Sequence, residues 1–188
     1  DSADAFGYMA MAGWKTEDML QGIDGIMSLA AASNEDLATT SDIVTDALTA
    51  FGLKASDSGH FADVLAQASA NANTNVGMMG ESFKYVAPVA GALKYSVEDV
   101  SLALGLMANA SVKGSMAGTS LKTSLANMAA PTDKMEAAMD KYGISLTKRN
   151  GEMKTMHEVL DNLRSSLGGL SETEQTAAAS TIFGKEAM

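Results

Sequence analysis

The side chains best suited to proton transfer or metal binding are two histidines, His60 and His157, which stand far apart in the sequence. Neither has a second histidine nearby, and the chain contains no cysteine. A zinc or other transition-metal site gathers several such ligands at characteristic spacing, so we expect no metal and no cofactor. The lack of cysteine also excludes disulfides and cysteine nucleophiles.

Paired carboxylates occur at positions 17 and 18 and again at Glu98 and Asp99. Such pairs serve as acid and base in glycoside hydrolysis. Both pairs fall in the first turn of a predicted helix, where the helix dipole stabilises negative charge, so we predict structural roles and no catalytic residue. No segment matches a glycine-rich phosphate loop, and residues 114–118 are predicted to form a turn where two helices approach closely.

Composition limits the class of protein. The chain has 188 residues and a net charge of −10, with 46% hydrophobic but only 5% aromatic residues and fourteen methionines. Its core must therefore be built from thin or flexible side chains on closely approaching helices. No run approaches the ~18 apolar residues of a membrane span, and no signal peptide is recognisable.

The charge is unevenly distributed. Residues 1–82 hold two lysines and twelve acids, whereas the remainder holds eleven bases and eleven acids. An acidic half repels phosphate backbones, so we expect no specific nucleic-acid binding. We interpret this half as a solvated acidic surface, with contact to a charge-matched neighbour as the alternative.

Apolar residues recur at helical spacing along most of the chain, which predicts a mainly α fold: a bundle of short helices rich in alanine, glycine and methionine. Val100, Leu104 and Met107 give one helix an apolar stripe, and Ser96 is suited to cap its start. Residues 33–36 have the spacing of a second capping box. Pro88 is predicted to kink or divide the helix that contains it.

One segment departs from the helical rhythm. Residues 144–147 alternate between apolar and polar, and Asn150 and Gly151 are typical of a two-residue turn. Residues 152–156 would then form the second strand, running back beside the first. The pattern predicts one small β-hairpin near residues 144–156, with Arg149 opposite Glu152.

No linker-like stretch divides the chain, although Pro131 indicates a soft boundary. We predict a helical core over residues 1–130, followed over residues 131–188 by a helix, the hairpin and two helices. The pattern of Met19, Ile23 and Ile26 recurs 81 residues later, which indicates either an internal duplication or a chance likeness of amphipathic helices. The chain begins within a helical pattern and stops at Met188 without a cap, so we expect a fragment of a much longer chain.

An ordered series of residues between positions 75 and 122 resembles the core region of tailed-phage tail tape measure proteins. The similarity continues to the run Phe183-Gly184-Lys185-Glu186-Ala187 and so covers nearly the whole chain. The residues that carry the resemblance, which we interpret as a structural motif, are Asn75, Gly80, Phe83, Tyr85, Pro88, Glu98, Asp99, Gly114, Gly118 and Gly184.

The resemblance implies a non-enzymatic, structural protein of the phage tail that determines tail length, acts in tail assembly inside the tail tube and takes part in DNA ejection. It implies a location in the virion, and in the host cytoplasm during assembly. The implied partners are the tail tube protein, tail chaperones, tail-tip proteins and further copies of the same chain.

Two alternative functions fit parts of the sequence. Glu81 and Ser82, followed by residues 105–107, resemble two fragments of the lytic transglycosylase signature of tail-associated cell-wall hydrolases. Ala108 stands where that signature has glutamine and its third motif is missing, while a catalytic glutamate needs oriented partners. The other alternative is a helical protein-interaction module, which narrow alanine, glycine and serine faces beside leucine and methionine stripes would suit.

Overall fold

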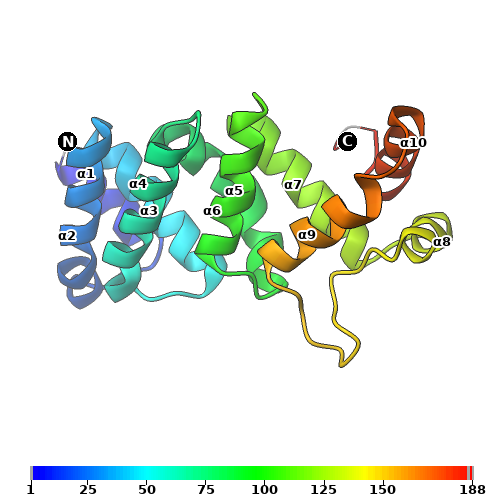
Figure 1. Cartoon of the computed structure of the whole chain (residues 1–188). Helices are drawn as coiled ribbons and strands as arrows, with labels where there is room; N and C mark the ends of the chain where they lie inside the picture. Colours follow the sequence, from blue (N-terminus) through cyan, green and yellow to red (C-terminus); the bar gives the residue numbers. More distant parts are fainter. Residues whose placement is uncertain (1, 186, 188) are drawn as a thin grey trace.

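The computed structural model describes residues 2–185 and 187, and these form helices joined by short connections (Figure 1). Asp1, Glu186 and Met188, including the predicted uncapped end and one residue of the run 183–187, lie outside the described residues. The ten α-helices of the described part are α1 (Ser2–Met11), α2 (Thr16–Ser33), α3 (Leu37–Phe51), α4 (Ser58–Asn71), α5 (Val76–Ala92), α6 (Val97–Asn109), α7 (Gly114–Ala129), α8 (Asp133–Tyr142), α9 (Met156–Leu167) and α10 (Glu172–Ile182). A single 3-10 turn, η1 (Ala55–Asp57), precedes α4. The predicted mainly α class is confirmed.

Helices α1 to α7 form two layers. In one layer α1, α3, α5 and α7 pack in that order, and in the other α2, α4 and α6 do the same. Each helix from α1 to α5 thus contacts the helix two positions further along the chain, and the array extends from the N-terminal helices towards α7 (Figure 1). None of the described helices is both long and apolar enough to cross a membrane.

The start of α6 is fixed by the capping residues that the sequence indicates. The Ser96 hydroxyl accepts the Asp99 backbone N–H at 3.1 Å, and the Asp99 carboxylate accepts the Ser96 backbone N–H at 3.3 Å. This reciprocal pair satisfies two backbone donors that would otherwise be left free at the helix end.

The capping box predicted over residues 33–36 is wrong. Ser33 ends α2, where its hydroxyl donates to the Leu29 carbonyl at 2.7 Å. Asn34 takes a left-handed conformation with φ of 57°, which separates the two helices. Asp36 is the cap of α3, because its carboxylate accepts the Thr39 backbone N–H at 2.9 Å.

The centre of the array contains an aromatic cluster. Phe83 of α5 lies edge-on to Phe51 of α3 and Phe61 of α4, with ring centroids 6.0 Å and 5.5 Å apart. Because α3 and α5 belong to one layer and α4 to the other, these contacts join the layers. Aliphatic side chains and methionines fill the surrounding core.

Glycines let neighbouring helices of a layer approach closely, as the composition predicts. A Cβ added to Gly118 of α7 would lie 2.2 Å from the Ser82 carbonyl oxygen of α5, and one on Gly91 of α5 would lie 2.3 Å from the Ala50 carbonyl oxygen of α3. Only glycine fits at such contacts. The turn predicted at residues 114–118 lies slightly earlier in the chain, because those residues already form the start of α7.

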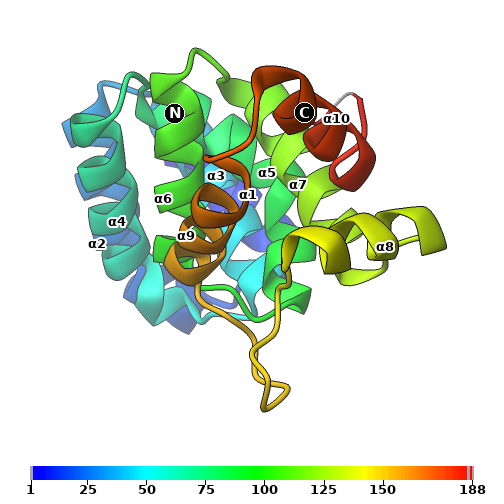
Figure 2. The ribbon, with the colours of Figure 1, turned by 45° about the vertical axis from the view of Figure 1, so that its right-hand side comes forward.

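The C-terminal region attaches to the end of the array. α9 packs against α6, α10 contacts both α7 and α8, and the loop of residues 143–155 projects away from the helices (Figure 2). The division at residue 130 stays a prediction.

The predicted β-hairpin near residues 144–156 is wrong. The described residues contain no strand, and the segment holds one isolated bridge between Thr147 and Met153. Asn150 explains part of the difference, since its side chain binds Glu152 twice, through the backbone N–H and the carboxylate. Two backbone hydrogen bonds join the flanks without forming strands: the Lys148 N–H donates to the Glu152 carbonyl at 2.7 Å, and the Lys154 N–H donates to the Leu146 carbonyl at 2.8 Å. A lone two-stranded hairpin is marginally stable in water, and here Leu146 and Met156 anchor the segment by burial.

The hydrogen bond from the Ser96 backbone N–H to the Asp99 carboxylate has counterparts elsewhere in the layer of α2, α4 and α6. Asp18, Asp57 and Asp99 each accept the backbone N–H of the residue three positions earlier, at 2.9 Å, 2.8 Å and 3.3 Å. They stand at the starts of α2, of η1 leading into α4, and of α6. Any first-turn aspartate can cap a helix in this way, so the internal duplication also stays a prediction.

Candidate functional site

The two histidines lie in separate, exposed contacts with carboxylates. His60 Nε2 lies 2.6 Å from Glu98 Oε1, and His157 Nε2 lies 3.3 Å from Asp161 Oδ2 one helical turn away. Within the part of the chain that the structure describes, no cluster of three or more histidine, cysteine or acidic residues could hold a metal ion.

Glu98 and Asp99 act at the first turn of α6. Burial tends to raise the pKa of Glu98, but hydrogen bonds from its own backbone N–H, Ser96 and His60 outweigh burial and hold that pKa below its ordinary value. Asp99 reaches further, since its second oxygen accepts the Met156 backbone N–H at 2.8 Å, where α9 begins. One carboxylate thus joins the starts of α6 and α9.

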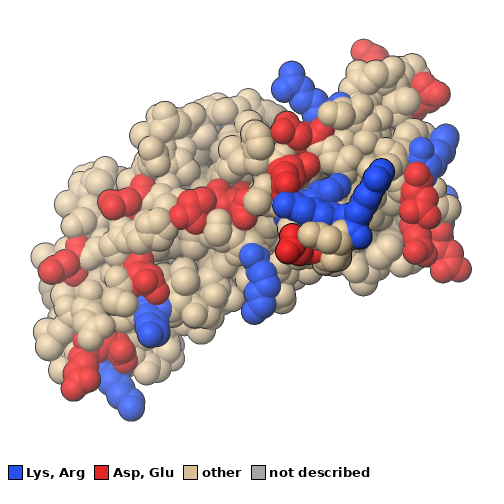
Figure 3. Space-filling view, turned by 60° about the horizontal axis from the view of Figure 1, so that its bottom comes forward, with Lys and Arg blue, Asp and Glu red and all other residues tan. Residues whose placement is uncertain are grey.

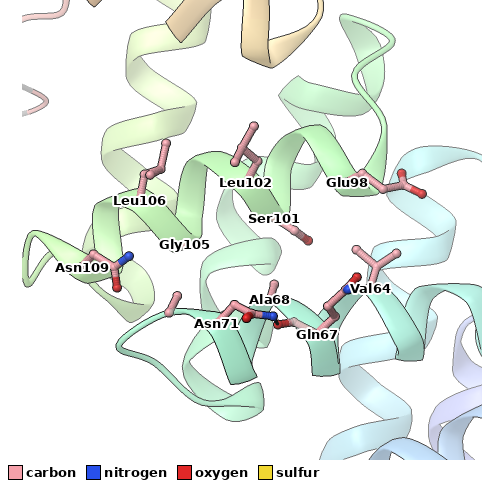
Figure 4. Close-up of a pocket in the computed structure, with 11 residues that line it drawn as sticks. Val64, Gln67, Ala68, Asn71, Glu98, Ser101, Leu102, Gly105, Leu106 and Asn109 are labelled. Atoms are coloured by element: carbon pink, nitrogen blue, oxygen red, sulfur yellow. Dashed lines mark hydrogen bonds between the residues drawn. The ribbon is translucent and has the colours of Figure 1, made fainter.

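A groove of about 290 Å³ lies between α4 and α6. Figure 4 shows Val64, Gln67, Ala68 and Asn71 on α4 facing the side of α6 that carries Ser101 and Gly105. Leu102 and Leu106 of α6 also line it, with side chains that point away from α4 in Figure 4, while Glu98 and Asn109 stand near its two ends. The sequence did not predict this groove, because small residues such as Ala68, Ala72 and Gly105 equally suit a close contact between helices.

The two transglycosylase-like fragments do not meet around this groove. Gly105 and Leu106 line it, but Glu81 is not among its lining residues. Glu81 lies on α5, in the other layer, and the neighbouring Lys84 forms an ion pair with Asp42 of α3. This hydrogen-bonded pair, helped by the nearby acids Asp46 and Glu81, raises the pKa of Lys84 despite partial burial.

The first part of the family-like motif lies on α5. Asn75 caps the helix by accepting the Met78 backbone N–H at 2.8 Å. Gly80 faces Ile43 of α3 so closely that a Cβ would lie 2.4 Å from its side chain, and Phe83 occupies the aromatic cluster. These residues position α5 against α3.

Two further motif residues, Tyr85 and Pro88, are exposed on α5. The helix continues beyond Pro88 to Ala92, so it is not divided at the proline. Packing against α3 on one side and α7 on the other holds the helix together despite the missing N–H donor.

The motif glycines lie at helix ends and contacts. Gly114 begins α7 with φ of 59°, and its carbonyl accepts the Ser82 hydroxyl at 2.8 Å. Gly118 makes the close contact with Ser82 described above. Gly184 follows α10 with φ of 88°, beside the Phe183 carbonyl that accepts Asn127 Nδ2 at 2.8 Å. The ten motif residues therefore support several helix junctions and do not converge on one chemical site.

Sequence reasoning missed Asn162 of α9, which holds the loop of residues 143–155. Its side-chain oxygen accepts the Ser145 backbone N–H at 3.2 Å and Lys154 Nζ at 2.8 Å, and its Nδ2 donates to the Gly143 carbonyl at 2.9 Å. A single asparagine within an amphipathic helix carries no sequence signal for such a role.

Comparisons with known proteins give one consistent answer. The family described as "Phage-related minor tail protein" matches residues 1–184. The whole chain is 36% identical to a stretch of the "Tape measure protein" of Pneumococcus phage Dp-1 and 26% identical to a stretch of the "Probable tape measure protein" of Escherichia phage P2. It spans only 16% and 23% of those two proteins. No solved structure is significantly similar. The resemblance read from residues 75–122 is confirmed.

Proposed function

This chain belongs to the phage-related minor tail protein family, and we propose that it is the folded core region of a tail tape measure protein, a structural component of the virion tail. The observation that carries the proposal is similarity over the entire chain to two proteins named as tape measures. The finer proposal is that the complete protein determines tail length, directs tail assembly and takes part in DNA delivery.

Within that role the region acts as a folded body and not as the ruler. A straight α-helix rises about 1.5 Å per residue, so 188 residues in one helix would span roughly 280 Å. Here the same residues fold back and forth through helices of at most 18 residues. Length measurement would therefore belong to other parts of the longer protein, and this region would supply contacts for assembly.

We assign no enzymatic role to the region, and the family-like residues are structural in this proposal. The geometry supports this assignment, because Asn75, Gly80, Phe83 and Gly118 act through caps and helix contacts. The proposed partners are the tail tube protein, tail chaperones and tail-tip proteins, with several copies of the chain in each tail. The proposed locations are the assembled virion and, before assembly, the host cytoplasm.

Deletions in the phage gene test the proposal. Removing helical residues outside this region should shorten tails by about 1.5 Å per residue on electron micrographs. Substituting Gly118→Leu, which forces a large side chain into the contact between α7 and α5, should instead abolish tail assembly without giving shorter tails.

The matched control is Gly7→Leu in α1, where a Cβ meets nothing within 4 Å. That variant should assemble tails of normal length. Tails of unchanged length after the deletions, or graded shortening with Gly118→Leu, would contradict the proposal. Peptidoglycan release by the purified chain that is lost in Glu81→Gln would assign it to the hydrolase class instead.

A further inference from the structure

The groove between α4 and α6 has properties that neither the family match nor a scaffold role accounts for. We propose that it is a docking site for a basic amphipathic α-helix of a partner protein. The inference does not depend on the proposed function, because it is carried by the groove's exposed leucines, its buried polar group and the charge of the helix layer that contains it.

The apolar contribution comes from α6. Leu102 and Leu106 are 41% and 50% exposed and lie one helical turn apart along the groove. From Glu98 to Asn109 the groove follows about three turns of helix, roughly 16 Å. A partner helix with apolar residues at every third or fourth position would cover this length with one face.

A buried hydroxyl supplies a second, independent observation. Ser101 is only 4% exposed, lines the groove, and its Oγ has no hydrogen-bond partner among the described residues. A buried polar atom without a partner is costly, so a polar side chain brought in by a docked helix would be stabilised there. The partner helix should therefore carry one hydrogen-bonding residue, such as asparagine, within its apolar stripe.

The other end of the groove is already ordered. Asn109 Oδ1 accepts the Asn73 backbone N–H at 2.8 Å, and Asn71 Nδ2 donates to the Gln67 carbonyl at 2.8 Å (Figure 4). The Asn109 bond links the end of α6 to the segment that follows α4, so this end of the groove is ordered in the chain without a partner. Pre-formed sites lose less entropy on binding.

Charge selects a basic partner. Helices α2, α4 and α6 contain no lysine or arginine, and they carry the acids Glu17, Asp18, Asp24, Asp63, Glu98 and Asp99. Acidic side chains predominate over the N-terminal half of the surface seen in Figure 3. Lysines or arginines flanking the apolar stripe of the partner would be attracted to this layer, whereas an acidic helix would be repelled.

A designed peptide tests the inference on the 188-residue chain. The probe is a fifteen-residue helix with a leucine stripe, one central asparagine and lysines elsewhere, and its matched counterpart has glutamate in place of lysine. Fluorescence anisotropy should show that the lysine peptide binds at least about tenfold more tightly than the glutamate peptide, and less tightly as salt increases.

Three variants locate the binding. The double variant Leu102→Ala/Leu106→Ala should weaken binding of the lysine peptide about tenfold. Leu20→Ala, which shortens a leucine that is 69% exposed on α2 outside the groove, should leave it unchanged. Ser101→Ala should weaken binding about fivefold while raising the temperature of unfolding, a combination that a purely structural hydroxyl would not give.

Several results would overturn the inference. They are equal binding of the lysine and glutamate peptides, equal weakening by Leu20→Ala and by the double variant, and failure of the lysine peptide to bind. Self-association of the chain that disappears in the double variant would identify a second copy as the occupant and would likewise overturn it.

Discussion

The two-layer array of α1–α7 and the C-terminal region of α8–α10 are held together in different ways. In the array, glycines such as Gly118 and Gly91 let helix backbones meet directly. In the C-terminal region, asparagine side chains connect separate segments: Asn162 binds the 143–155 loop, and Asn127 of α7 binds the end of α10. Close contact between helices depends on the missing side chain of glycine, whereas the asparagine links depend on particular hydrogen-bonding groups.

The array and the C-terminal region also differ in their buried hydroxyl groups that lack hydrogen-bond partners. Ser69, Tyr95 and Ser101 are the described residues whose buried side-chain oxygens have no hydrogen-bond partner, and all three lie in the array. Each such group costs roughly 1–3 kcal/mol. The array can carry this cost because its helices bury a continuous apolar core, while the smaller C-terminal region has fewer buried side chains to offset it.

The largest expected effect comes from filling a close contact in the array. Gly118→Ala places a Cβ 2.2 Å from the Ser82 carbonyl oxygen, so α5 and α7 must move apart. We expect the free energy of unfolding to fall by about 3 kcal/mol, measured by urea denaturation.

The matched control is Gly59→Ala in α4, where an added Cβ meets nothing within 4 Å. Because alanine is the better helix former, this variant should be as stable as the original or more stable, by up to about 1 kcal/mol. Equal destabilisation by both substitutions would show that close contact does not hold the array.

A smaller and more local effect is expected from cutting a tether. Asn162→Ala removes the bonds to Ser145, Lys154 and Gly143, which should cost about 1–2 kcal/mol. Hydrogen exchange should accelerate in residues 143–155 and leave α3 and α5 protected. Asn150→Ala at the exposed loop tip is the control and should have little effect on protection elsewhere. Loss of protection throughout the array in Asn162→Ala would contradict the distinction between the two regions.

The sequence predicted the features that depend on neighbouring residues. The cap at Ser96, the helical stripe of Val100, Leu104 and Met107, and the family resemblance are all local patterns, and the structure or the comparisons confirm them. The prediction of a capping box at residues 33–36 was wrong because two residues suited to cap a helix, Ser33 and Asp36, lie within four positions. Asp36 succeeds since its carboxylate reaches Thr39, while Asn34 turns the chain before it.

Features that depend on distant residues could not be predicted in the same way. Asn150 and Gly151 do form a turn, but how far the flanks pair also depends on what they pack against. Pairing here stops at two backbone hydrogen bonds, and the Asn162 side chain binds Ser145 and Gly143 at the start of the segment. The groove between α4 and α6 is likewise a property of two helices separated in the chain by residues 72–96. Its unpartnered Ser101 is visible only once the neighbours of that hydroxyl are known.

The smallest effect tests whether an unpartnered hydroxyl in the array carries a cost. Burial, with the nearby Asp99 carboxylate, raises the pKa of Tyr95 to about 12. The folded pKa lies above the ordinary value of 10.0, so the unfolded chain loses this proton at a lower pH than the folded chain. Ionisation of Tyr95 therefore leaves the free energy of unfolding unchanged below pH 10.0 and lowers it as the pH rises from there through 12. Tyr95→Phe should increase the free energy of unfolding at pH 7 by about 1 kcal/mol and should remove this tyrosine's part of the alkaline loss. Thermal unfolding between pH 7 and pH 11 measures both effects, with the exposed Tyr85→Phe as a control expected to leave the free energy of unfolding at pH 7 unchanged. If Tyr95→Phe is less stable than the original chain, the hydroxyl stabilises the array. That result would contradict the expectation that the buried hydroxyl carries a free-energy cost.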